Sequence, residues 1–222
     1  MKRVLLQCGA VLLLLTAITG LQAQQAAFYN DIQAFKKQDA AQMPAAHSIL
    51  FVGSSSFTKW TDVQDYFPGY TIINRGFGGS SLPDVIRYAD DIIFPYQPKQ
   101  VVIYCGENDL AASDTVSAAT VVQRAETLVG MIRQKLGKVP LVFISLKPSP
   151  SRSRLLPKIK DANAQIKAFL AKDKKAVFAD VYSKMLDPDG QPIKDIFLGD
   201  NLHMNARGYA IWQKVLTPLL VK

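Results

Sequence analysis

At residues 49–56 the chain reads Ile49-Leu50-Phe51-Val52-Gly53-Ser54-Ser55-Ser56. Four consecutive apolar residues, closed by a glycine and small polar residues, are typical of a strand buried on both faces, as in a parallel sheet. In open parallel sheets, ligands bind outside the carboxyl ends of the strands. This stretch therefore predicts a central strand that delivers serine hydroxyl groups to the edge of the sheet where such folds carry their chemistry.

Apolar runs of the same kind recur along the chain and alternate with stretches of helical spacing. The further predicted strands cover residues 70–74, 100–105, 140–145 and 176–179. The predicted helices cover residues 26–43, 80–94, 115–136, 157–171 and 205–220, and the stretch around Trp60 and Phe67 is expected to be irregular. This alternation predicts an α/β fold with a five-stranded parallel sheet between two layers of helices, a three-layer α/β/α sandwich. No repeat divides the chain, so we expect one domain over residues 24–222.

The first residues are typical of an export signal rather than of a folded domain. Lys2 and Arg3 precede an apolar run over residues 4–21, and the small residue Ala23 precedes a polar stretch. This pattern predicts a signal peptide over residues 1–23, and therefore a secreted or periplasmic protein without stable membrane association after cleavage. An uncleaved membrane anchor is the alternative, because the run approaches the about 20 residues that a membrane span needs.

Composition excludes several classes of function. The formal net charge is +8, but lysines spread over solvated helix surfaces explain this better than an acidic polymer partner does. The sequence has no arginine-rich helix, stacking-aromatic pattern or finger motif, so we expect no nucleic-acid partner. With two histidines and no HExxH or CxxC motif, a three-histidine zinc site is excluded, and we expect neither a metal nor a cofactor.

The two histidines, His47 and His203, are expected to lie at opposite ends of the sheet. His47 precedes the first strand, so we expect it at the surface of the amino end. Asp200 stands three residues before His203, close enough to hydrogen-bond the far ring nitrogen and fix its tautomer. Alone, this DxxH motif is weak, because a helix-entry loop with Asn205 as its cap would explain part of it.

Two other strand ends carry groups that suit ester chemistry. Gly106-Glu107-Asn108-Asp109 follows the third strand, and Gly78-Gly79 follows the second. An asparagine amide can donate to a developing oxyanion, and the bare backbone N–H of a glycine can approach a ligand closely. Each feature alone also fits a turn or a helix cap. Together, three strand ends supply serine, glycine and asparagine, and the last loop supplies aspartate and histidine.

These four features, in this order, resemble the SGNH branch of the GDSL hydrolases, which are serine esterases with a flavodoxin-like sheet. The resemblance extends from Gly53 to His203, nearly the whole mature chain. It implies that Ser55 is the nucleophile, and that His203 and Asp200 are the base and the orienting acid of a catalytic triad.

The resemblance also implies an oxyanion site and shows one departure from the family pattern. The backbone N–H groups of Ser55 and Gly79 and the amide of Asn108 would bind the oxyanion. The family usually has aspartate where this chain has Ser54. Because three serines are adjacent, Ser54 and Ser56 stay open as alternative nucleophiles.

The expected function is hydrolysis of carboxylic esters through an acyl-enzyme. The chain holds no insertion long enough for a hydrophobic lid, which favours a small-acyl (acetyl) esterase acting on a carbohydrate or another polar substrate. A lipase or lysophospholipase of the same fold is one alternative. A catalytically silent sugar-binding module, which the serine at position 54 keeps open, is another. The sequence does not determine the oligomeric state.

Overall fold

The computed structural model describes residues 25–222; the predicted signal peptide at residues 1–23 lies outside the described residues. Its parallel sheet consists of β1 (Ile49–Gly53), β2 (Ile72–Gly76), β3 (Gln100–Tyr104), β4 (Leu141–Ile144) and β5 (Ala176–Ala179). The strand order is β2-β1-β3-β4-β5, the flavodoxin-like order, so the predicted sheet is confirmed. In this register Gly53 lies opposite both Gly76 and Tyr104, so three strands end side by side.

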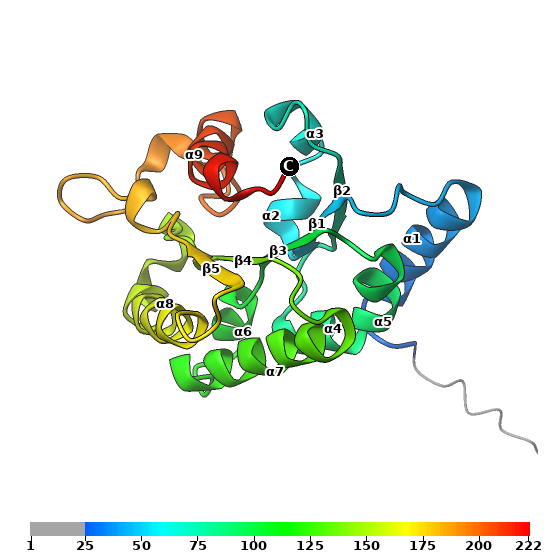
Figure 1. The fold of residues 1–222 in the computed structure, drawn as a ribbon. Helices are drawn as coiled ribbons and strands as arrows, with labels where there is room; N and C mark the ends of the chain where they lie inside the picture. Colours follow the sequence, from blue (N-terminus) through cyan, green and yellow to red (C-terminus); the bar gives the residue numbers. More distant parts are fainter. Residues whose placement is uncertain (1–24) are drawn as a thin grey trace, which may run out of the picture.

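Helices cover both faces of the sheet (Figure 1). They are α1 (Tyr29–Ala41), α2 (Ser55–Thr58), α3 (Val63–Tyr66), α4 (Leu82–Arg87), α5 (Ala89–Ile92), α6 (Glu107–Ala112), α7 (Ala118–Leu136), α8 (Leu156–Leu170) and α9 (Ala206–Leu216). Short 3-10 helices are η1 (Phe94–Tyr96), η2 (Pro150–Leu155), η3 (Ser183–Met185), η4 (Lys194–Ile196) and η5 (Thr217–Leu219). Figure 1 shows α4, α7 and α8 on one side of the sheet and α2, α3 and α9 on the other.

The central strand β1 contributes to two separate hydrophobic cores. Leu50 and Val52 pack among the residues of the layer that contains α7 and α8. Ile49 and Phe51 face the other layer, where two tryptophans, Trp60 and Trp212, are fully buried. Because both faces are covered, all five residues of β1 are buried, which explains its continuous apolar sequence.

The structure corrects several predicted boundaries. Strand β2 ends at Gly76 rather than at residue 74, and the expected irregular stretch after β1 contains the short helices α2 and α3. The helix predicted over residues 80–94 divides into α4, α5 and η1, with a break at Tyr88, whose backbone leaves the helical region. The Tyr88 hydroxyl donates to the carbonyl of Ala27, 2.7 Å away. The loop expected after β3 is helix α6, entered through Gly106 at a φ of 124°.

Gly53 sits at the point where β1 passes into α2, and a side chain there has no room. Its φ is 146°, and an added Cβ would lie 1.9 Å from the carbonyl oxygen of Tyr104 on β3. Glycine is therefore required by the backbone conformation and by the close approach of two strands.

We expect Gly53→Ala to lower the free energy of unfolding by about 3–5 kcal/mol, because it adds a clash to a strained backbone. Urea unfolding followed by circular dichroism measures this. Gly130→Ala is the matched control, since Gly130 lies inside α7 with open space around it. It should raise stability by about 0.5–1 kcal/mol. Equal stability of Gly53→Ala and the wild-type protein would contradict the role assigned to Gly53.

Candidate active site

Ser55 is the first residue of α2, directly beyond the end of β1. The N–H of Ser54 donates to the carbonyl of Tyr104 at 3.0 Å, which ties this turn to β3. The hydroxyl of Tyr209, on α9, donates to the carbonyl of Ser56 at 2.8 Å. The backbone is thus held on both sides of Ser55, and its side chain is half-buried.

His203 is positioned by the loop that enters α9. Asn205 caps this helix by accepting hydrogen bonds from the N–H groups of Arg207 and Gly208 at 2.9 and 3.3 Å. The N–H of Leu198 donates to the carbonyl of His203 at 2.7 Å. The capped helix and this loop contact fix the backbone from which the imidazole extends.

Ser55, His203 and Asp200 form a continuous chain of hydrogen bonds. The Nε2 atom of His203 lies 3.0 Å from the Oγ atom of Ser55, and its Nδ1 atom lies 2.6 Å from Oδ2 of Asp200. An ionised carboxylate only accepts hydrogen bonds, so Nδ1 carries the ring proton and Nε2 can accept the proton of the serine hydroxyl. The structure thus brings together the three residues that the sequence predicted as a triad.

Asp200 is stabilised in its charged form by the loop around it. Its Oδ1 atom accepts the N–H groups of Leu202 and His203, each at 2.9 Å. Partial burial alone would raise the pKa of Asp200, but the hydrogen bond with the His203 ring and these two N–H groups outweigh it and hold the pKa well below its usual value. The carboxylate is therefore ionised throughout the neutral range.

The structure distinguishes the three adjacent serines. Within residues 25–222, Ser55 is the one of the three whose hydroxyl contacts His203. The hydroxyl of Ser56 is buried and has no hydrogen-bond partner among these residues. Ser54 is the N-cap of α2, and it is buried with 5% of its surface exposed.

We expect Ser54→Ala and Ser56→Ala to keep covalent labelling by a fluorophosphonate probe, because neither hydroxyl contacts the imidazole. Gel fluorescence of the labelled proteins measures this, and a thermal melt shows that each variant is folded. Ser56→Ala should keep wild-type stability or exceed it, because it removes a buried hydroxyl without a partner. Loss of labelling in either folded variant would move the nucleophile away from Ser55.

Gly79 lies in a turn that is fastened to the end of β1. The N–H of Phe77 and the hydroxyl of Ser80 both donate to the carbonyl of Gly53, at 2.9 and 3.3 Å. Gly79 is exposed and has a φ of 86°. In the part of the chain that the structure describes, no acceptor contacts the backbone N–H of Gly79 or of Ser55. Both groups are available to a ligand at this edge of the sheet.

Asn108 is the second residue of α6, which follows β3, the neighbour of β1. Its Nδ2 atom donates to the carbonyl of Ser80 at 2.9 Å, and its Oδ1 atom accepts from Nη2 of Arg152 at 2.7 Å. Ser80 follows Gly79 directly, so the amide of Asn108 is tied to the turn that carries the Gly79 N–H. One Nδ2 hydrogen is engaged by Ser80, and the other remains for a ligand.

Behind Asn108 lies a buried charged cluster that the sequence did not reveal. Glu107 accepts from Lys147 at 2.8 Å, from Arg152 at 2.9 Å and from the hydroxyl of Ser149 at 3.1 Å, and it also contacts the hydroxyl of Tyr104. Burial alone would raise the pKa of Glu107, but the two cations outweigh it and lower that pKa. Burial lowers the pKa of Lys147, and the carboxylate offsets part of this effect. The sequence features that could have indicated this cluster are Glu107, directly before Asn108, and Lys147, shortly after the buried strand β4.

Asp109, the last residue of the GxND motif, has a structural role. Its Oδ2 atom accepts the N–H of Leu82 at 2.9 Å, and its Oδ1 atom pairs with Arg124 at 2.7 Å. Burial raises its pKa, although these contacts oppose the shift. Asp109 therefore joins the starts of α4 and α6 to α7 and positions the loops without touching the triad.

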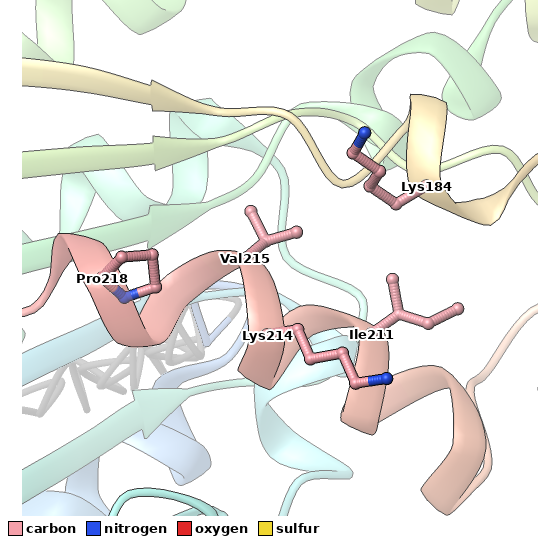
Figure 2. Close-up of a pocket in the computed structure, with 5 residues that line it drawn as sticks. All are labelled: Lys184, Ile211, Lys214, Val215 and Pro218. Atoms are coloured by element: carbon pink, nitrogen blue, oxygen red, sulfur yellow. The ribbon is translucent and has the colours of Figure 1, made fainter.

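Two of the surface cavities differ in their relation to the candidate site residues. One cavity, of about 460 Å³, lies beside α9 and is lined by Lys184, Ile211, Lys214, Val215 and Pro218, which Figure 2 shows as sticks. It contains none of the predicted site residues. A second cavity, of about 340 Å³, is lined by Pro150, Ser151, Lys194 and Asn201. Asn201 directly follows Asp200, so this second cavity borders the triad loop.

Two further features of the described residues bear on the kind of site. Within residues 25–222, no group of three or more histidine, cysteine or acidic side chains is arranged to hold a metal ion. Over the same residues, no helix combines the length and the apolar character needed to cross a membrane.

Comparison with known proteins gives one family and a common fold. The sequence model of the GDSL-like lipase/acylhydrolase family matches residues 45–211. A protein from Bacteroides fragilis assigned as an acylhydrolase has a similar structure, with a TM-score of 0.73 at 22% identity over 86% of this chain and 95% of that one. A GDSL-like lipase from Bacteroides thetaiotaomicron gives 0.73 at 20% identity, covering 84% and 95%.

A catalytic mutant of an acetylxylan esterase from Geobacillus stearothermophilus gives a TM-score of 0.62 at 14% identity, covering 81% of this chain and 96% of that one. At these identities the structural matches show the fold alone. The search of curated proteins gives no match. The family match contains Ser55, Gly79, Asn108, Asp200 and His203.

Proposed function

Because the chain belongs to the GDSL-like lipase/acylhydrolase family, we propose that it is an exported serine esterase that removes small acyl groups, above all acetyl, from a carbohydrate or another polar alcohol. The observation that carries this proposal is the hydrogen-bond chain from Ser55 through His203 to Asp200. This is the arrangement by which a base activates a serine and an acid orients the base.

In the proposed reaction, Nε2 of His203 takes the hydroxyl proton as Oγ of Ser55 attacks the ester carbonyl carbon. The tetrahedral oxyanion accepts hydrogen bonds from the N–H groups of Ser55 and Gly79 and from the Asn108 amide. His203 then gives the proton to the leaving alcohol, and an acyl-enzyme remains on Ser55. Water then gives a proton to His203 and attacks the acyl carbonyl carbon, the carboxylic acid leaves, and His203 returns the proton to Oγ of Ser55.

A polar alcohol is supported by the surroundings of the triad. The cavity that borders the loop of Asp200 through Asn201 is lined by Ser151, Lys194 and Asn201 together with one proline, a set that suits hydroxyl-rich ligands. The large apolar side chains exposed among the described residues are spread over α1, the segment after it, β5 and the loop before Asp200: Tyr29, Met43, Val177 and Leu198. This distribution gives a lipid little continuous apolar surface to bind.

The substrate class is tested with purified wild-type protein and Ser55→Ala. Both are assayed on acetylated xylan, acetylated monosaccharides, and soluble and micellar esters of increasing acyl length. We expect the highest kcat/KM on acetyl esters, and none of this activity in Ser55→Ala. Activity that rises with chain length and with micelle formation would instead support a lipase or lysophospholipase. If the protein binds sugars but neither hydrolyses esters nor is labelled by a fluorophosphonate, the catalytically silent sugar-binding module would be supported.

Export is the part of the proposal that rests on the first 23 residues. The basic residues Lys2 and Arg3 and the apolar run after them support secretion or release into a periplasm. Amino-terminal sequencing of the protein recovered from the medium or periplasm should begin at Gln24. Recovery of the full-length chain with the membrane fraction would support an uncleaved anchor instead.

A further inference from the structure

We propose that Arg152 is a positioning residue of the oxyanion site, which sets the orientation of the Asn108 amide. The inference rests on the proposed function, because it assigns a role within that reaction. Arg152 lies in η2, after β4, and is not part of any of the four sequence features that indicated the family. Its guanidinium contacts Asn108 and Glu107 at the same time.

The neighbours of Asn108 determine which way its amide points. Arginine can only donate hydrogen bonds, so the atom at 2.7 Å from its Nη2 has to be the amide oxygen of Asn108. The carbonyl of Ser80 can only accept, so the atom at 2.9 Å from it has to be the amide nitrogen. The two contacts exclude the flipped amide, in which the amide nitrogen would face the guanidinium and the amide oxygen would face the Ser80 carbonyl.

Arg152 is itself held by a buried carboxylate. Its Nη1 atom lies 2.9 Å from Glu107, whose side chain is 3% exposed and is also bound by Lys147 and Ser149. The planar guanidinium fork reaches Glu107 and Asn108 with two nitrogens, a geometry that a lysine ammonium cannot reproduce. Since Glu107 and Asn108 are adjacent on α6, the fork also locks the start of this helix.

The same cluster also compensates the negative charge of Glu107, which lies close to the proposed oxyanion site. Glu107 is one residue from Asn108, and its charge would oppose the charge that develops on the substrate oxygen. Two cations, Lys147 and Arg152, face this one carboxylate. Loss of Arg152 therefore removes both the orientation of the donor and part of the favourable charge behind it.

A double-mutant cycle with Arg152→Met, Asn108→Ala and the combined variant tests whether Arg152 acts through Asn108. We expect Arg152→Met to lower kcat by about 10- to 100-fold, with KM changed less than about threefold, because the oxyanion contact strengthens in the transition state. In the Asn108→Ala background, the same change should lower kcat by clearly less than it does in the wild-type background, because only the loss of charge behind the site remains and no amide is left to orient. Arg152→Lys should recover only part of the loss, since it restores the charge without the fork.

Arg154→Met is the matched control. Arg154 lies two residues further along η2 and pairs with Asp114 at 2.8 Å, and both side chains are largely exposed. The control removes the same charge from the same segment without touching Asn108, so its kcat should stay near the wild-type value. A kcat of Arg152→Met near wild type, or an equal loss in both backgrounds, would overturn the inference.

A crystal structure of Arg152→Met gives a readout that does not depend on turnover. We expect the Asn108 side chain to rotate and to leave the Ser80 carbonyl, and we expect it to keep its place in Arg154→Met. An unchanged Asn108 in Arg152→Met would overturn the inference even if the enzyme is active. If the wild-type protein hydrolyses no ester and Ser55 is not labelled, the proposed function fails. The crystal structure of Arg152→Met would still show whether Arg152 orients the Asn108 amide. Arg152→Lys replaces Arg152→Met in the crystal experiment if the latter does not fold.

Discussion

Ser55→Ala and His203→Ala are each expected to reduce ester hydrolysis by about 10⁴- to 10⁶-fold, and the double variant should be little worse than either. The reason is that the two residues act as a unit: the imidazole accepts the proton of the hydroxyl that lies 3.0 Å away. Turnover of an acetyl ester measures the loss. Fluorophosphonate labelling should disappear in Ser55→Ala and slow sharply in His203→Ala.

His47→Ala is the control for these variants. His47 is exposed and precedes β1 at the amino end of the sheet, opposite the edge that carries Ser55. Its removal should leave turnover nearly unchanged. Equal losses in His47→Ala and His203→Ala, or labelling that survives in Ser55→Ala, would contradict the assigned triad.

Asn108→Asp is expected to lower kcat by about 100- to 1,000-fold and to be at least as damaging as Asn108→Ala. The carboxylate would keep the contact with Arg152 but would place an oxygen where the amide nitrogen now lies 2.9 Å from the Ser80 carbonyl. It would also set a negative charge against the oxyanion. The loss should appear in kcat more than in KM, which steady-state kinetics on a soluble ester can separate.

Asn163→Asp separates this catalytic effect from a purely structural one. The amide of Asn163 donates to the carbonyl of Leu146 at 2.9 Å, so the substitution creates the same oxygen–oxygen contact at a buried site outside the candidate active site. It should lower stability while the folded fraction keeps its kcat. A folded Asn108→Asp enzyme with near-normal turnover would leave Asn108 as a turn residue only.

The strands were predictable because each is an apolar run between turn residues. Residues 176–179 were assigned as β5 with the bounds that the structure has, and β1 was assigned to within one residue. The nearness of Ser55, Gly79 and Asn108 was predictable for a related reason, whereas His203 and Asp200 lie in the last loop and were named as triad members by the family resemblance. Parallel strands end at one edge, so the groups that follow β1, β2 and β3 had to lie near one another. The break at Tyr88 was not predictable, because no glycine or proline stands at this point of the helical pattern to mark it.

The sequence did not indicate which charged residues lie buried behind the proposed oxyanion site. Glu107, Lys147 and Arg152 are residue types expected at the surface, and only the folded chain shows that the two cations pair with the one carboxylate beside Asn108. The family resemblance named Ser55 among the three serines, but the residues alone left Ser54 and Ser56 open, since adjacent identical residues carry no pattern. The start of α2 decides it, because successive helical residues point about 100° apart and only Ser55 faces the imidazole.

Helix α9 packs against α2, and this contact determines when the proposed catalytic residues come together as the chain folds. The proposed nucleophile and its base are separated by 148 positions, and the hydroxyl of Tyr209, on α9, fastens the carbonyl of Ser56. Gln100, at the start of β3, holds the segment after α9 through the carbonyl of Leu219 and the N–H of Val221. A chain that emerges from its amino end has its hydroxyl long before its base. A chain that lacks the segment from Asp200 onward would therefore be inert in the proposed reaction, which can begin only after the last helix has docked.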